Sequence, residues 1–122
     1  MPFATSFYVD RRLIITRAWG HIRMADVRAL RQELAAWPEF DPTWAHVLDA
    51  REEVQFDISS DETRRLAETS VFTPWARRAM VATDRAVFGR FRKYGALFEN
   101  QVDGSVVGVF TTLNDAIEWV TP

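Results

Sequence analysis

The sequence predicts an α/β domain, in which helices pack on a largely parallel sheet. Two observations carry this prediction. Short apolar runs of strand length alternate along the chain with longer segments of helical periodicity. Strands that alternate with helices need crossover connections, which are right-handed in almost every known case. We therefore expect about five strands in one mixed sheet, with the N-terminal strand antiparallel and the later strands parallel, and about four helices.

Composition bounds the class of protein. The 122 residues are 48% hydrophobic and 26% charged, which is typical of one globular domain, here residues 1–122. No apolar run is long enough to span a membrane, and we expect a cytoplasmic protein. The chain has no cysteine, which excludes disulfides and thiol nucleophiles. A net charge of −2 argues against nucleic acid as a partner.

The first elements follow from local patterns. The β-rich runs Ser6–Val9 and Leu13–Thr16 predict an N-terminal hairpin. Apolar residues at helical spacing then predict a helix over Ala25–Trp37, which Pro38 ends. The short apolar run Ala45–Leu48 predicts a buried strand.

A second helix should begin at Ser60 and end near Ser70. Ser59 and Glu62 have the spacing of a capping box, in which each side chain accepts a hydrogen bond from the other residue's backbone. The loop Val71–Trp75 leads to another predicted strand, Ala79–Ala82.

Two further helices complete the pattern. Asp84 is a suitable N-cap for an aromatic-rich third helix, within which Gly89 and Gly95 indicate a close approach or a bend. The last strand should be Ser105–Phe110, and Thr112 should cap the final helix. The apolar stripe of that helix comprises Leu113, Ala116, Ile117 and Val120.

These elements together resemble the SpoIIAA-like branch of the STAS superfamily. The strings that carry the resemblance are Val47–Arg51, Phe56–Glu62, Arg77–Ala82 and Val87–Gly89, and the likeness extends over nearly the whole chain. Relatives of that fold include anti-sigma factor antagonists, domains attached to anion transporters and, more distantly, lipid carriers of the CRAL-TRIO type. The resemblance implies a regulatory or binding domain that works without catalysis.

The resemblance suggests one regulatory site. In anti-sigma factor antagonists a serine at the start of the second helix is phosphorylated, and that serine corresponds to Ser60. A phosphate at a helix N-terminus meets unpaired N–H groups. Ile58 and Asp61 depart from the family string, and simple helix capping is the alternative explanation of the serines. We predict a protein partner at the acidic start of this helix, formed by Asp57, Ser59, Ser60 and Asp61.

A second hypothesis is a small apolar, lipid-like ligand near the third helix. Aromatic residues make up 13% of the chain, and some of them are expected to line a pocket. The alternative is that they only fill the core. The candidate ligand-binding residues are Phe72, Trp75, Phe88, Phe91 and Phe98.

Charge is unevenly distributed along the sequence. Basic residues gather around the fourth strand and third helix, whereas acidic residues crowd the connection that precedes the second helix. Such a division suits a protein partner, including a pairing of two copies of the chain, and an ordinary solvated surface is the alternative. The basic set is Arg77, Arg78, Arg85, Arg90, Arg92 and Lys93.

Catalytic signatures are weak. His21 and His46 have no spacing that suggests a metal site or a nucleophile and base, and His46 is expected to begin a strand. Asp49 ends that strand and pairs either with a neighbouring glutamate, as a catalytic dyad would, or with Arg51, as a structural carboxylate would. We predict no enzymatic activity, no metal and no cofactor.

Overall fold

A five-stranded mixed sheet organises the molecule. The structure is a computed structural model that describes residues 2–99 and 106–122, without the side chains of residues 98 and 99. The antiparallel pair lies at one edge, and every other pairing in this sheet is parallel, as predicted. In spatial order the strands are β1 (Phe3–Tyr8), β2 (Leu13–Ala18), β4 (Ala45–Asp49), β6 (Arg78–Val81) and β7 (Val107–Phe110).

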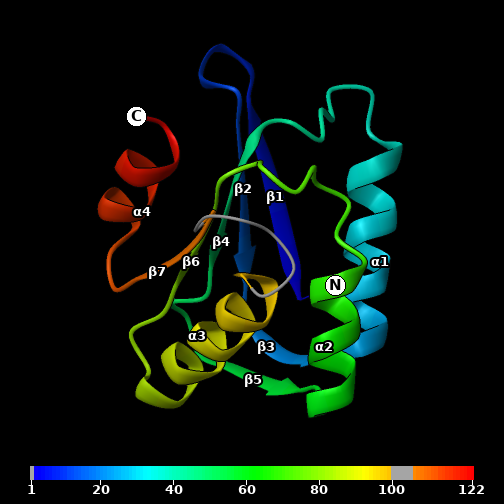
Figure 1. The fold of residues 1–122 in the computed structure, drawn as a ribbon, viewed down its shortest axis with the longest axis vertical. Helices are drawn as coiled ribbons and strands as arrows, with labels where there is room; N and C mark the ends of the chain where they lie inside the picture. Colours follow the sequence, from blue (N-terminus) through cyan, green and yellow to red (C-terminus); the bar gives the residue numbers. More distant parts are fainter. Residues whose placement is uncertain (1, 100–105) are drawn as a thin grey trace.

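Four helices cover the two faces of the sheet unequally. Figure 1 shows α4 on one side of the sheet and the other three helices on the opposite side. The buried apolar residues form two clusters accordingly, a large one under α1, α2 and α3 and a small one under α4. The helices are α1 (Met24–Ala36), α2 (Ser60–Glu68), α3 (Arg85–Glu99) and α4 (Leu113–Val120), and a short 3-10 helix, Val9–Arg11, joins β1 to β2.

The structure adds a small parallel ladder that the sequence patterns did not predict. After β2, Gly20 adopts a φ of +74°, which glycine tolerates best, and its N–H donates to the Glu53 carbonyl. The chain thereby leaves the main sheet and forms β3 (Gly20–Arg23), which pairs with β5 (Val54–Asp57). Val54 and Phe56 face inward while Gln55 is exposed, so β5 has the two-residue alternation of a half-buried strand.

Helix caps agree with the sequence patterns. Ser59 Oγ accepts from the Glu62 N–H at 3.1 Å, and Glu62 Oε1 accepts from the Ser59 N–H at 2.9 Å. Asp84 Oδ1 accepts from two N–H groups in the first turn of α3, and Thr112 Oγ1 accepts from the Asp115 N–H. At the start of α1, Asp26 Oδ2 likewise accepts from the N-cap N–H at 2.8 Å. Each of the four described helices therefore begins where a polar side chain satisfies a backbone donor.

One of the two glycines in α3 marks a close approach between elements. A Cβ built on Gly95 would lie 3.4 Å from Val107 Cγ1, so α3 packs tightly on β7 at this point. Gly89 has open space around it, and nothing in the structure explains that glycine. The predicted strand Ser105–Phe110 begins at Val107, and Ser105 lies outside the described residues.

The capping box gives a stability prediction with a neighbouring control. Replacing Ser59 with alanine should lower the free energy of unfolding by about 1 kcal/mol, because the Glu62 N–H loses its acceptor. The exposed Ser60, replaced in the same way, should change it by less than about 0.5 kcal/mol. Urea denaturation measures both values, and equal effects of the two substitutions would contradict the assigned cap.

Candidate functional site

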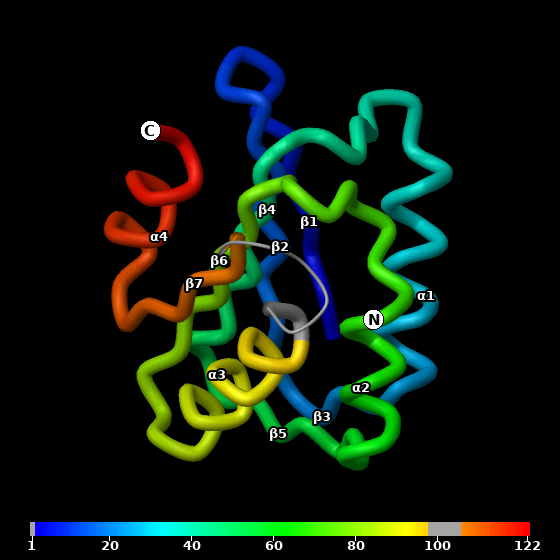
Figure 2. Tube along the Cα trace, viewed as in Figure 1, coloured from blue at the N-terminus to red at the C-terminus, as the bar shows by residue number. Residues whose placement is uncertain are grey.

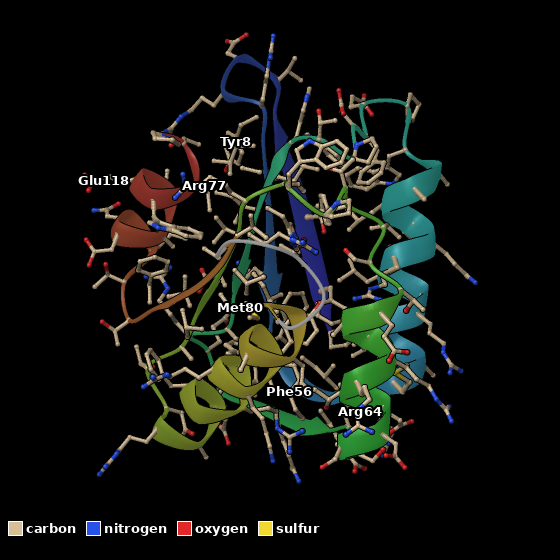
Figure 3. The ribbon with its side chains drawn as sticks, viewed as in Figure 1. Tyr8, Phe56, Arg64, Arg77, Met80 and Glu118 are labelled. Carbon is tan, nitrogen blue, oxygen red and sulfur yellow. The ribbon has the colours of Figure 1, made fainter. Side chains whose placement is uncertain are left out.

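A cavity of about 150 Å³ lies between the sheet and the three helices on its larger face. Its floor is formed by residues of β4 and β6, and its walls come from α1, α2, α3 and the loop after α2. Figure 3 labels two of the lining residues, Met80 and Phe56, in the region of α3. Most of the wall is apolar, and its apolar side chains include Leu30, Leu34, Leu48, Ile58, Leu66 and Phe91.

Two polar residues interrupt the apolar floor. His46 in β4 and Arg78 in β6 are direct partners in the parallel register, so their side chains lie next to each other on the same face of the sheet. Both residues line the cavity. Sequence reasoning treated His46 only as the start of a strand and placed Arg78 on a basic surface.

Arg78 is a buried residue with only 6% of its surface exposed. Its Nε donates to the Ala76 carbonyl at 3.2 Å and its Nη1 donates to Ser70 Oγ at 2.8 Å. Burial lowers the pKa of the Arg78 guanidinium below its usual value, although arginine keeps its charge in proteins. A fixed positive charge therefore lies in the wall of an apolar cavity.

His46 belongs to a hydrogen-bonded row that crosses three strands. Its Nε2 lies 2.9 Å from Thr16 Oγ1, which in turn lies 3.1 Å from Thr5 Oγ1. The ring stacks on Phe72 with centroids 4.9 Å apart. Burial lowers the pKa of His46 to about 3, with further lowering by the positive charges of Arg78 and Arg31. The imidazole is therefore neutral at physiological pH.

Arg31 joins the two helices that form one wall of the cavity. Its guanidinium donates to the Leu66 carbonyl at 2.9 Å and to the Thr69 carbonyl at 3.0 Å, so α1 is tied to the last turn of α2. Figure 2 shows the two helices side by side and the chain continuing from α2 into the loop that precedes β6. These contacts set the width of the cavity on that side.

The predicted basic surface is divided by the sheet. Arg77 points toward α4, where its guanidinium carbon lies 4.3 Å from the Trp119 ring centroid, as Figure 3 also shows. Arg78, the next residue, points to the opposite face because consecutive strand residues alternate. The prediction that Arg78 belongs to a charged surface is therefore wrong.

Of the aromatic residues predicted to bind a ligand, only some line the cavity. Phe72 and Phe91 line the cavity. Phe88 is partly buried against the same core but is not among the described lining residues. Trp75 is 67% exposed and borders a shallow surface hollow with Arg12 and Arg77 instead. The side chain of Phe98 lies outside the described residues.

The residues predicted to bind a protein partner lie on the surface at the start of α2. Asp57, Ser60 and Asp61 are exposed, and Asp57 Oδ2 lies 3.4 Å from His21 Nε2. Ser59 is occupied in the capping box described above. The structure brings these four residues together along one short stretch of chain, with open access to solvent.

The sequence allows Asp49 to pair with a neighbouring glutamate or with Arg51, and the structure shows the pair with Arg51. Arg51 donates to both carboxylate oxygens, with Nε 2.8 Å from Oδ1 and Nη2 2.9 Å from Oδ2. Burial by itself raises the pKa of Asp49, but the hydrogen bonds from Arg51 outweigh it and leave the pKa below its usual value. A carboxylate held in this way is a poor general base.

Comparison with known proteins identifies the fold. No family model matches the sequence, and no curated protein is similar enough in sequence to match it. Similar solved structures include an uncharacterised protein of the DUF3478 family with a SpoIIAA-like fold, from Shewanella loihica PV-4. That protein is 16% identical, the match covers 97% of this chain and 91% of that chain, and the TM-score is 0.58.

The protein therefore has a SpoIIAA-like α/β fold, which confirms the resemblance at the level of fold. Among the described residues, no helix is long and apolar enough to cross a membrane.

The partly buried imidazole of His46 gives a prediction on pH dependence. In the unfolded chain His46 takes up a proton near pH 6.5, whereas in the folded protein it stays neutral down to about pH 3. The unfolded state then binds more protons, so stability should fall as pH falls through this window. Between about pH 7 and about pH 5 the loss attributable to His46 should reach about 2 kcal/mol.

A glutamine at position 46 is the matched variant, since its amide can still reach Thr16 but does not titrate. Urea denaturation across this pH range should show a flatter stability profile for His46→Gln than for the wild type. Parallel profiles would show that His46 titrates normally in the folded protein.

Proposed function

We propose that the protein is a non-enzymatic binding domain that holds a small apolar ligand in the cavity between the sheet and its three helices. The single observation that supports this proposal is an unfilled apolar space of about 150 Å³ in the larger core of the molecule. Protein interiors are normally packed as densely as organic crystals, with few voids larger than a water molecule. A space of this size is therefore unusual for a core that serves stability alone.

Packing favours an occupant. Apolar side chains that line an unfilled space lack van der Waals partners on that side. A ligand that fills the space supplies those contacts.

The volume of the cavity limits the size of the ligand that it can hold. A cavity of about 150 Å³ lined by Leu, Ile and Phe binds benzene in another protein, whereas sites for drug-sized ligands measure about 300 to 1,000 Å³. The present cavity matches the smaller class. The ligand is then a single ring or a short acyl chain, which narrows the lipid-like ligand predicted from the sequence.

The partner-binding hypothesis rests on a different surface. Asp57, Ser60 and Asp61 are accessible to another protein, but exposed acidic side chains are equally satisfied by solvent. We rank ligand binding in the cavity above partner binding at the start of α2, because the packing of the sheet and three helices forms the cavity.

Binding of an apolar probe tests the proposal. Benzene added to the wild-type protein should raise the midpoint of thermal unfolding by a few degrees, since a ligand at ten times its Kd stabilises by about 1.4 kcal/mol. Leu48→Phe should abolish the rise, because Leu48 lies on the cavity floor and the larger side chain occupies the space. Differential scanning calorimetry measures the shift.

Ile117→Phe is the matched control, because it enlarges a partly exposed aliphatic residue of α4, on the far face of the sheet. This variant should respond to benzene like the wild type. If benzene and other single-ring probes leave the wild type unchanged in calorimetry and in amide NMR spectra, the cavity is not a ligand site.

The regulatory hypothesis has its own test. Mass spectrometry of protein isolated from its own cells reports whether Ser60 carries a phosphate. Phosphate on Ser60 would support the partner-switch hypothesis for α2. Its absence across growth conditions would leave helix capping by Ser59 as the reason for the serine pair.

A further inference from the structure

β1 leaves one edge of the five-stranded sheet open. The strand lies at the end of the spatial order, next to β2. The Trp19 N–H donates to the Pro2 carbonyl at 3.0 Å, which fixes the pattern of hydrogen bonds between the two strands. Alternate residues of an antiparallel strand direct both backbone groups to the same side, so Ala4, Ser6 and Tyr8 direct theirs to β2. The residues between them direct their N–H and C=O groups away from the sheet, and they are Phe3, Thr5 and Phe7.

β1 lacks several features that usually protect a sheet edge. Edges of soluble proteins are commonly blunted by charged side chains, by proline, by a bulge or by a very short strand. The sequence of β1, FATSFY, has no charged residue and no proline. Its pairing with β2 continues through six consecutive residue pairs without a bulge, whereas the strand at the other edge, β7, is only four residues long. An uncharged, regular edge of this length is suited to pairing with a further strand.

Apolar surface continues from this edge onto the neighbouring elements. Four large hydrophobic side chains are exposed in the described part of the chain, and three of them, Tyr8, Val9 and Trp37, lie at or beside the end of β1. Trp37 belongs to this group because its ring packs against Phe7 of β1, with centroids 4.5 Å apart. A partner that covers the edge would therefore also remove apolar surface from water.

We propose that two copies of the chain pair through β1, with the two strands antiparallel about a two-fold axis at Thr5. In this register Phe3 pairs with Phe7 of the second copy, and Thr5 pairs with its own equivalent. Each outward N–H and C=O group of these three residues then has a backbone partner, and the two sheets become one continuous sheet. The inference is independent of the ligand proposed for the cavity.

The sequence of β1 is compatible with its own copy. A two-fold axis sets a surface against itself, so a charged strand would meet like charges, and the uncharged β1 does not. Phe3 and Phe7 form an aromatic cross-strand pair, while the small side chains of Ala4 and Ser6 lie opposite each other. Registers centred on Ala4 or Ser6 would leave one of the outward residues opposite a residue outside β1, so the axis at Thr5 gives the most complete pairing.

Sedimentation velocity of the wild-type protein tests the pairing. The measured mass should rise from that of one chain to that of two over about a hundredfold range of protein concentration, because association follows mass action. A wild type that stays monomeric throughout would overturn the proposal and leave a strand of another protein as the occupant of this edge.

A matched pair of double variants tests the register. In the proposed dimer Ala4 lies directly opposite Ser6 of the second copy, and both side chains are exposed in the single chain. A4E/S6E sets like charges opposite each other at both positions, whereas A4K/S6E sets opposite charges there. The dimer of A4E/S6E should therefore dissociate at a concentration at least about tenfold higher than that of A4K/S6E.

Pairing within one chain predicts the reverse order of stability. Ala4 is opposite Arg17 in β2, so a glutamate at position 4 has a favourable neighbour in its own chain and a lysine does not. Poor folding of A4E/S6E thus cannot explain a weaker dimer, and urea denaturation of both variants checks this point. Equal dimerisation of the two variants would show that the copies meet at another surface and would overturn the pairing through β1.

Discussion

The register between β4 and β6 is the constraint on which the rest of the structure depends. It sets His46 opposite Arg78 on the face of the sheet that three helices cover, so two polar groups must be accommodated inside the larger core. Burying such groups is costly unless hydrogen bonds satisfy them. Thr16 contacts the imidazole, and Ser70 and the Ala76 carbonyl hold the guanidinium. The loop between α2 and β6 is therefore fixed by a side chain of the strand that follows it.

The two faces of the sheet differ in consequence. Under α4 the buried cluster is small and wholly aliphatic, with Val47, Val81 and Ala116 fully enclosed. Under α1, α2 and α3 the side chains surround a space that they do not fill. The contrast follows from alternation along the strands, which directs Arg78 and Met80 to one face and Ala79 and Val81 to the other. The face that carries the polar pair is also the face that carries the cavity.

Local patterns predicted most of the fold and little of the site. Caps, helix periodicity and short apolar runs depend on neighbours in sequence, and they located α1, α2, β4 and β6 to within a few residues. The ladder of β3 and β5 was missed because four-residue strands give a weak signal, although Val54 and Phe56 alternate with polar residues. The cavity was missed because its described lining comes from five strands, three helices and two loops, and volume is a property of their packing. The charged residue within the apolar run of β6 was the available signal for Arg78, and it was interpreted as surface charge.

A crystal of the protein grown with iodobenzene offers the most direct measurement, because anomalous scattering locates the iodine without reference to a model of the ligand. The account predicts one strong iodine peak inside the cavity, among the apolar residues of α1 and α3. Iodine peaks confined to the molecular surface, with an empty cavity, would contradict it.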